Sequence, residues 1–138
     1  MSEPDPILTF TAFSRSRAMQ FELAALNEQG RFTASVLTNA DGLPIAAATT
    51  SGSRLVDLLA AVAPLVQRMV QRSNERAGLP VAHEVAIRNA DQSRLVCRFF
   101  EAGDEMLILA CVVAGNLPHR RAMNQAVRAI AKIWSAEP

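Results

Sequence analysis

Hydrophobic residues recur in two different patterns along this chain, and the changes between the patterns divide it into eight segments. Apolar residues return every three or four positions in three stretches, which is typical of helices packed on one side, whereas five shorter stretches alternate or are continuously apolar, which is typical of strands. All six glycines fall where a segment begins or ends. The predicted order is αββαβββα, with helices at residues 15–27, 54–77 and 118–135 and strands at residues 32–38, 43–49, 81–88, 94–100 and 105–113.

Turn residues and alternation indicate where the strands lie in the sheet. Asp41-Gly42 supplies the positive φ that a tight hairpin needs between the first two strands. Pro44 cannot donate a ladder hydrogen bond, so the second strand should lie at a sheet edge. Residues 105–113 are apolar on both faces and predict a central, covered strand. Residues 81–88 alternate between apolar and polar, which indicates a second edge.

The length of 138 residues predicts a single domain with one hydrophobic core. We expect this domain to span residues 15–138. Residues 1–14 form a weakly determined N-terminal lead-in, whose apolar stretch at residues 7–13 could pack on the domain as an extended segment.

The second predicted helix is unusually apolar. Ser53 is a candidate N-cap, and over the first three turns apolar residues lie on nearly every side. Such a helix must be covered all round, because monomers seldom expose large apolar patches. A sheet can cover one flank, and a second copy can cover the other. The alternative is that the first helix or the lead-in segment covers that flank.

We therefore predict a homodimer. The helix would be about 36 Å long, enough for an antiparallel pair across a two-fold axis, and Pro64 should bend it. Pairing the edge strand with its symmetry mate would remove an aggregation hazard. The predicted interface comprises Leu55, Leu58, Leu59, Val62, Leu65, Val66 and Met69 of the helix and Val81, His83, Val85 and Ile87 of the next strand.

Composition and charge exclude several classes of partner. The formal net charge of +1 gives no electrostatic reason to bind nucleic acid, and with six Phe, one Trp and no Tyr a base-stacking surface is poorly supplied. The acidic N-terminus has no signal-peptide pattern, and the longest apolar run, residues 106–115, is about half a bilayer-spanning length. We expect a cytoplasmic protein with no membrane partner.

Motifs for catalysis or ligand binding are missing from the sequence. It contains no phosphate-binding loop, so we expect no GTP hydrolysis, and it contains neither a G-x-S-x-G nor an H-E-x-x-H pattern. Cys97 and Cys111 lie in apolar strands and are interpreted as buried thiols, with a disulfide or redox role as the alternative. We predict no catalytic residues, no cofactor and no metal site.

Two basic stretches remain. Arg68, Arg72 and Arg76 recur every four residues near the end of the second helix, where they form either a solvated face or a contact for an acidic partner. Arg120 and Arg121 follow His119 at the start of the last helix, where the dipole disfavours positive charge. They indicate an anionic contact, unless their aliphatic stems simply cover core residues.

Four features together resemble the roadblock family of dynein light-chain-like proteins. They are the element order, the "VLTNADGLPIA" hairpin, the long helix after "TSGS", and the passage "ILACVVAGNLPHRRAMNQA". The resemblance covers roughly residues 15–135. It implies an α+β, roadblock/profilin-like fold: a five-stranded antiparallel sheet with the long helix on one face and two helices on the other. It also implies dimerisation through the long helix and the following strand.

Bacterial members of that family are commonly partners and regulators of small Ras-like GTPases, and the resemblance implies such a partner here. The leading hypothesis is a homodimeric regulatory or scaffold module for a small Ras-like GTPase. The alternative is a module that senses a small molecule held between sheet and helices, which requires a cavity there. The extended N-terminus and Pro64 depart from the family pattern.

Overall fold

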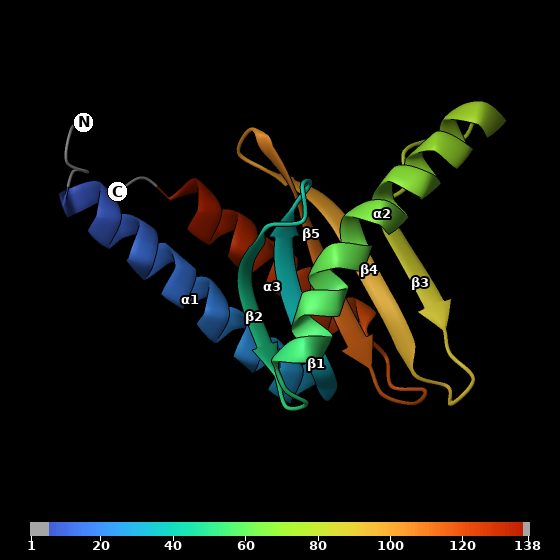
Figure 1. Cartoon of the computed structure of the whole chain (residues 1–138), viewed down its shortest axis with the longest axis horizontal. Coiled ribbons are helices and arrows are strands. Elements are labelled where there is room, and N and C mark those ends of the chain that lie inside the picture. Colours follow the sequence, from blue (N-terminus) through green and yellow to red (C-terminus); the bar gives the residue numbers. More distant parts are fainter. Residues whose placement is uncertain (1–5, 137–138) are drawn as a thin grey trace.

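The computed structural model describes the backbone of residues 6–136 and the side chains of residues 14–136. Within them, five antiparallel strands form one sheet between two helical layers (Figure 1). The helices are α1 (Pro6–Gly30), α2 (Ser53–Ala77) and α3 (Arg120–Ser135); the strands are β1 (Phe32–Asn39), β2 (Pro44–Thr49), β3 (Glu84–Arg88), β4 (Arg94–Ala102) and β5 (Glu105–Val113). The strand order is β2-β1-β5-β4-β3, which confirms the predicted central strand and both predicted edges.

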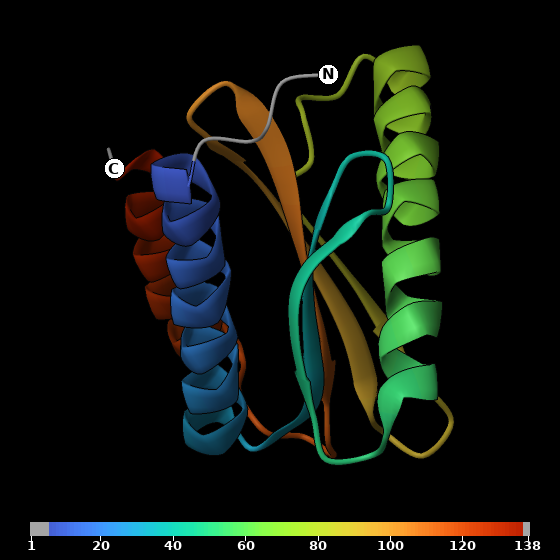
Figure 2. The ribbon, with the colours of Figure 1, turned by 60° about the vertical axis from the view of Figure 1, so that its left-hand side comes forward.

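The two faces of the sheet are covered by different helices. Figure 2 shows α1 and α3 on one face and α2 alone on the other. On the first face, Met19, Leu23, Met123 and Ile130 pack with inward side chains of β1, β4 and β5. On the second face, smaller clusters contain Leu59, Ala60, Ala63 and Val66 of α2. Because helices cover the sheet on both faces, the central strand β5 is buried along nearly its whole length.

The hairpin between β1 and β2 packs directly on α2. The Asn39 side-chain oxygen accepts hydrogen bonds from the backbone N–H groups of Asp41 and Leu43, at 2.9 and 3.0 Å, which closes the turn. Gly42 has φ +86°, and a Cβ added there would lie 3.3 Å from the Ala60 carbonyl oxygen. That carbonyl has no helical donor, because Pro64 lacks an N–H. The glycine therefore allows close contact between the turn and the helix.

The first helix is longer than predicted. It begins at Pro6, so the extended conformation considered for residues 7–13 is wrong. A proline at the start of a helix is favourable because its missing N–H would have no helical partner. No other proline or glycine follows before Gly30. Residues 1–5 of the predicted lead-in lie outside the described residues.

Several other boundaries also differ from the prediction. Gly52, not Ser53, is the N-cap of α2, and no side chain caps the helix; Ser53 is its first residue. β3 begins at Glu84, three residues later than predicted, although the His83 carbonyl still accepts a hydrogen bond from the Phe99 N–H. α3 begins at Arg120, after Pro118 and His119. Helix and strand ends depend on local hydrogen bonds that periodicity does not reveal.

Candidate partner-binding surface

The outer face of α2 is apolar and uncovered by its own chain. Leu58, Leu65 and Met69 are 54%, 57% and 64% exposed, and Val62 is also exposed. We call these four residues the α2 seam. Both α1 and α3 lie on the opposite face of the sheet (Figure 2), so the alternative that α1 covers this flank is wrong.

The inner face of α2 is used within the chain. Leu59 and Val66 are buried against the sheet, and Leu55 is half-buried beside Leu59. Leu59 and Val66 were predicted at the dimer interface, but within the single chain both side chains face the sheet. The sequence pattern did not separate the two faces of this helix. When a helix is apolar on nearly every side, periodicity does not reveal which side packs on the sheet.

The last turns of α2 extend past the sheet (Figure 1) and carry the basic row Arg68, Arg72 and Arg76. All three arginines are exposed. Together with Leu65 and Met69 they line a shallow hollow of about 720 Å³. The structure thus places the basic row directly beside the α2 seam.

The edge formed by β3 and the residues before it is the second part of the predicted interface. Val81 is 78% exposed, and His83 and Ile87 are also exposed. Val85 instead turns inward and packs beside Cys97 and Val66. The outer edge of β3 pairs with no strand among the described residues, so its backbone groups are open to another chain.

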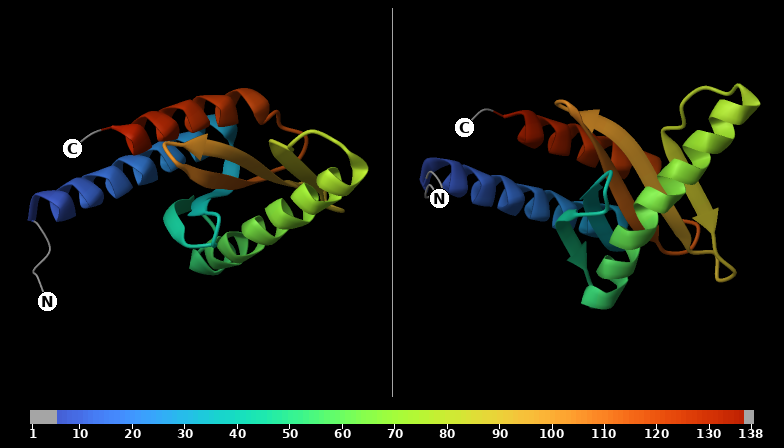
Figure 3. Two further views of the ribbon diagram at one scale, coloured as in Figure 1. Left: turned by 90° about the horizontal axis from the view of Figure 1, so that it is seen from above. Right: turned by 45° about the horizontal axis from the view of Figure 1, so that its top comes forward.

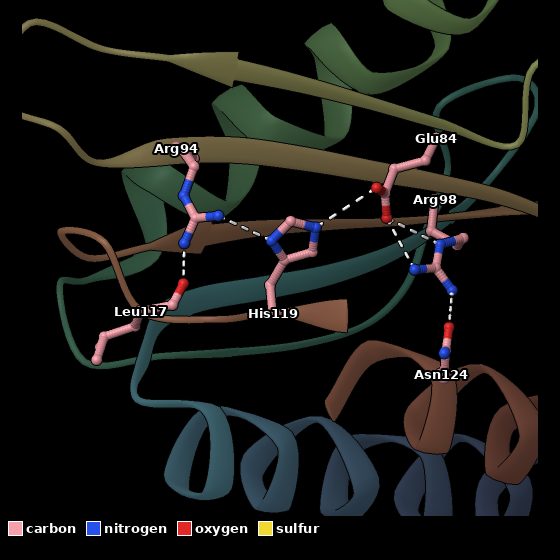
Figure 4. Close-up of polar contacts among 6 residues, drawn as sticks. All are labelled: Glu84, Arg94, Arg98, Leu117, His119 and Asn124. Carbon is pink, nitrogen blue, oxygen red and sulfur yellow. Dashed lines mark hydrogen bonds and ion pairs between the residues drawn. The ribbon is translucent and has the colours of Figure 1, made fainter. Parts of the chain in front are cut away.

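A polar network that no pattern in the sequence predicted ties this edge to the start of α3 (Figure 4). The Glu84 carboxylate accepts two hydrogen bonds from Arg98, at 2.8 and 3.1 Å. His119 Nε2 lies 3.4 Å from the other Glu84 oxygen, and its Nδ1 lies 3.0 Å from an Arg94 guanidinium nitrogen. A guanidinium can only donate, so Nδ1 accepts and the ring hydrogen is on Nε2, facing Glu84.

The network also controls the charge of Glu84. Burial raises the pKa of this carboxyl, but hydrogen bonds from Arg98 and His119 and the charge of Arg98 outweigh burial, so the pKa lies below its ordinary value of 4.5. Arg98 also donates to the Asn124 side-chain oxygen on α3 at 2.6 Å, and Arg94 donates to the Leu117 carbonyl. β3, β4 and α3 are therefore held together by charged hydrogen bonds. The sequence gave only a weak signal for this network. The alternation of residues 81–88 put Glu84 on the face of the strand that Val85 does not share.

The reactive side chains of this structure are buried or dispersed. Cys97 and Cys111 are both free and buried, and burial raises the pKa of the Cys97 thiol to about 11. Among the described residues, no three His, Cys, Asp or Glu side chains gather where they could hold a metal ion. No helix in the described part of the chain is long and apolar enough to cross a membrane.

Comparison with known proteins rests on structure, because neither the family models nor the curated proteins gave a match. The chain is similar to Myxococcus xanthus MglB, with a TM-score of 0.76, 11% identity and coverage of 100% of this chain and 98% of that chain. For the gliding protein MglB of Thermus thermophilus the TM-score is 0.73 at 17% identity, covering 86% and 90%. For a roadblock/LC7 domain of Streptomyces avermitilis it is 0.68 at 16% identity, covering 83% and 92%.

These similarities are similarities of fold. They extend over most of both chains in each case, and the resemblance drawn from the sequence is confirmed at this level. With its sheet order and its helices divided two and one between the faces, the chain has the roadblock/LC7 fold of these MglB and roadblock structures.

Proposed function

We propose that this protein is a homodimeric regulatory or scaffold module that binds a small Ras-like GTPase. The observation that carries this proposal is the outer face of α2, where an exposed apolar seam lies beside a basic row. Large exposed apolar patches usually mark contacts with other proteins. The roadblock/LC7 fold supports the same class of function through the family resemblance described above.

The spacing of the seam fits an antiparallel pair of α2 helices. Its residues, Leu58, Val62, Leu65 and Met69, are separated by intervals of four, three and four, which read the same in both directions. A second copy running the opposite way therefore places Leu58 against the partner's Met69 and Val62 against the partner's Leu65. The two-fold axis would pass beside Ala63 and Pro64. Such self-complementarity is what a two-fold interface requires.

The β3 edge extends the same assembly. Two copies that pair through the outer edge of β3 would join their sheets and cover the open backbone groups. Val81, His83 and Ile87 would then approach the partner copy. The proposed interface does not include Leu59 and Val66, although both were predicted there from the sequence. Val85 contributes only indirectly, because it packs beneath β3 on the inside of the fold.

The basic row would form the surface that binds the GTPase. In the antiparallel pair, the residues around Arg72 and Arg76 would lie opposite the first turn of the partner copy's α2, so each end of the helix pair presents positive charge. Arg68, Arg72 and Arg76 favour an acidic surface, and Leu65 and Met69 add apolar contact at the hollow between them. A GTPase would bind with an acidic patch near its switch regions.

Nucleotide-dependent capture tests this function. The purified protein is immobilised and incubated with an extract of the native cell containing either GDP or a non-hydrolysable GTP analogue. We expect a small protein with a phosphate-binding loop to bind in one nucleotide state more than tenfold better than in the other. The variant Arg68→Glu/Arg72→Glu should lose this partner, whereas the control Arg121→Glu/Arg128→Glu, on the opposite face, should retain it.

The captured protein is then purified and titrated directly in both nucleotide states. Equal affinity in both states, or equal loss of binding in the two double variants, would contradict the proposed site.

One observation keeps the small-molecule alternative open. A hollow of about 640 Å³ lies between α2 and the ends of β4 and β5, lined by Gln67, Gln71, Phe99 and Met106 among others. Its mixture of amide and apolar groups would suit a small, partly polar ligand. Native mass spectrometry of the purified protein would detect a retained molecule. If the wild-type protein shows only the mass of its polypeptide, with no retained compound, this alternative is contradicted.

A further inference from the structure

Positive charge is concentrated on the helical layer opposite α2. The whole chain has a formal net charge of +1, yet α3 contains four basic residues and no acidic one: Arg120, Arg121, Arg128 and Lys132. Arg121, Arg128 and Lys132 are exposed and follow a helical spacing that puts them on one outward face together with Gln125. The amphipathic helix α3 thus turns a basic face to solvent.

These charges have no ion-pair partner among the described side chains. Within residues 14–136 the salt bridges are those of Glu84 with Arg98 and His119, so none of the four basic residues of α3 forms one. Arg120 and Arg121 lie in the first turn of the helix, where the dipole disfavours positive charge. The arrangement costs the isolated chain stability, which points to an external anion.

A fifth basic residue lies just after the end of α1. Arg31 follows the end of α1 with φ +56°, the left-handed conformation that glycine commonly takes there. Arg31 and Arg121 line one hollow of about 300 Å³, whose other lining residues include no carboxylate. Two like charges at one concave site repel each other unless an anion lies between them.

The same face presents one large apolar side chain. Phe21 on α1 is 75% exposed. It lies one helical turn from Ala25, which lines the groove between α1 and α3, and Glu22 is the one carboxylate among the residues that line this groove. The two helices lie side by side in Figures 2 and 3 and contact each other along the layer. Phe21 therefore shares the outward side of this layer with the basic residues of α3.

We propose that the outer face of the α1–α3 layer binds the anionic surface of a lipid bilayer. The hollow between Arg31 and Arg121 would hold a headgroup phosphate, Arg128 and Lys132 would face further headgroups, and Phe21 would enter the interface. The charges lie along α3 and just past the end of the antiparallel helix α1 instead of in one deep pocket, which suits a broad anionic surface. Phe21 favours lipid over nucleic acid, because among residues 14–136 it is the one aromatic side chain that is largely exposed on this layer, and a single ring provides no base-stacking platform.

The proposed dimer would strengthen this contact but is not needed for it. Two sheets joined through antiparallel β3 edges are related by an axis perpendicular to the sheet, so both α1–α3 layers would lie on the same side. The lipid surface does not depend on the GTPase proposal. The expectation of no membrane partner in the sequence analysis rested on the lack of a spanning segment, which does not bear on adsorption to a surface.

Vesicle co-sedimentation tests the proposal. The full-length protein is mixed with vesicles of phosphatidylcholine alone or with about one third phosphatidylserine. We expect binding to the anionic vesicles only, weakening as salt rises from 50 to 500 mM because the charges are screened. Arg121→Glu/Arg128→Glu should reduce binding at least about tenfold, since each basic residue near an anionic surface contributes roughly fivefold. Phe21→Ser should weaken binding at every salt concentration.

The matched control is Arg68→Glu/Arg72→Glu, which makes the same change of charge on α2 and should bind vesicles like the wild-type protein. Circular dichroism checks that each variant is folded. No binding to anionic vesicles, equal binding to neutral ones, or equal loss in both double variants would overturn the proposal. So would wild-type binding to a single-stranded DNA 30-mer that is tighter than its binding to the anionic vesicles.

Discussion

Cys97 and Cys111 lie on neighbouring strands, yet their side chains belong to opposite faces of the sheet. Cys97 pairs in register with Ala110, and Cys111 with Val96, so the two cysteines are offset by one position. Cys97 packs in the cluster under α2, and Cys111 in the cluster under α1 and α3. A disulfide between them is therefore excluded in this fold, because the sheet lies between the sulfurs. The buried-thiol interpretation from sequence is confirmed.

Both thiols should be unreactive in the native protein. Burial raises the pKa of Cys97 to about 11 and raises the pKa of Cys111 well above its ordinary value, so almost no thiolate is present at pH 8. We expect 5,5′-dithiobis(2-nitrobenzoic acid) to modify neither cysteine over minutes under native conditions and both in 6 M guanidinium chloride. Rapid modification of either one in the folded protein would contradict the described burial.

Glu84 should make stability depend on pH. Its pKa is lowered in the folded state, so its contribution is present above the ordinary value of 4.5 and is lost as pH falls through the lower folded value. Glu84→Gln should cost about 1 kcal/mol at pH 7, because it removes the charge from the hydrogen bonds with Arg98. The difference from wild type should shrink below pH 4.5. Urea unfolding at several pH values measures it, and a constant difference down to pH 3 would contradict this role.

At the scale of elements, α2 combines two surfaces that the sequence did not separate. Its inner face packs on β1, β2 and β5, and its outer face is the seam. The hairpin turn fixes one side of the helix through the approach of Gly42 to Ala60 and Pro64. A proline inside the helix is thus tolerated where another segment contacts the carbonyl that it leaves without a donor.

Gly42→Ala should destabilise the fold by about 2–3 kcal/mol, because a Cβ there meets the Ala60 carbonyl in addition to the strain of positive φ. Gly78→Ala is the matched control. Gly78 has φ +69° but nothing within 4 Å of an added Cβ, so strain alone should cost about 1 kcal/mol. Denaturant unfolding at a fixed protein concentration compares them. Equal losses in the free energy of unfolding of the two variants would mean that a Cβ at position 42 does not clash with α2.

At the scale of the whole molecule, the fold leaves its most apolar exposed surface, beside the basic row, on the α2 side and the basic face of α3 on the other side. The α2 side offers mainly an apolar contact and the α1–α3 layer a charged one. A partner on one face would not block a partner on the other. In the proposed dimer, a second copy would contact α2 and β3, and the α1–α3 layer on the other face of the sheet (Figure 3) would stay exposed.

Leu58→Asp should disrupt the dimer far more than Arg72→Ala. The aspartate would put an unpaired charge in the seam, and each dimer carries the change twice, so we expect the dissociation constant to rise at least about a hundredfold. Arg72→Ala should change it by less than about threefold. Sedimentation equilibrium or light scattering over a range of concentrations measures both. The folded monomer should survive, because Leu58 is exposed within a single chain.

Wild-type protein that remains monomeric at high concentration would contradict the dimer, as would equal weakening by both substitutions.

The order of helices and strands, the central β5, the two edge strands and the Asp41-Gly42 hairpin could all be read from the sequence. These features depend on local periodicity and on residues with restricted backbone conformations, and both act over a few positions. The Glu84–Arg98–His119 network could not be predicted, because its members lie on three elements and meet only when β3, β4 and the start of α3 come together. The start of α1 was missed because Pro6 was taken for part of a lead-in when it is the first residue of a helix.

By itself, the sequence determined that this chain forms one sheet with three helices and that the second helix is too apolar to be covered by the sheet alone. Only the tertiary structure decided which side of that helix meets the sheet, since Leu59 and Leu58 are adjacent residues of the same kind and differ only in the direction they face. It also decided that Arg31 and Arg121, which are far apart in the sequence, line one hollow. The physical reason is that local propensity acts along the chain, whereas burial and charge interact through space.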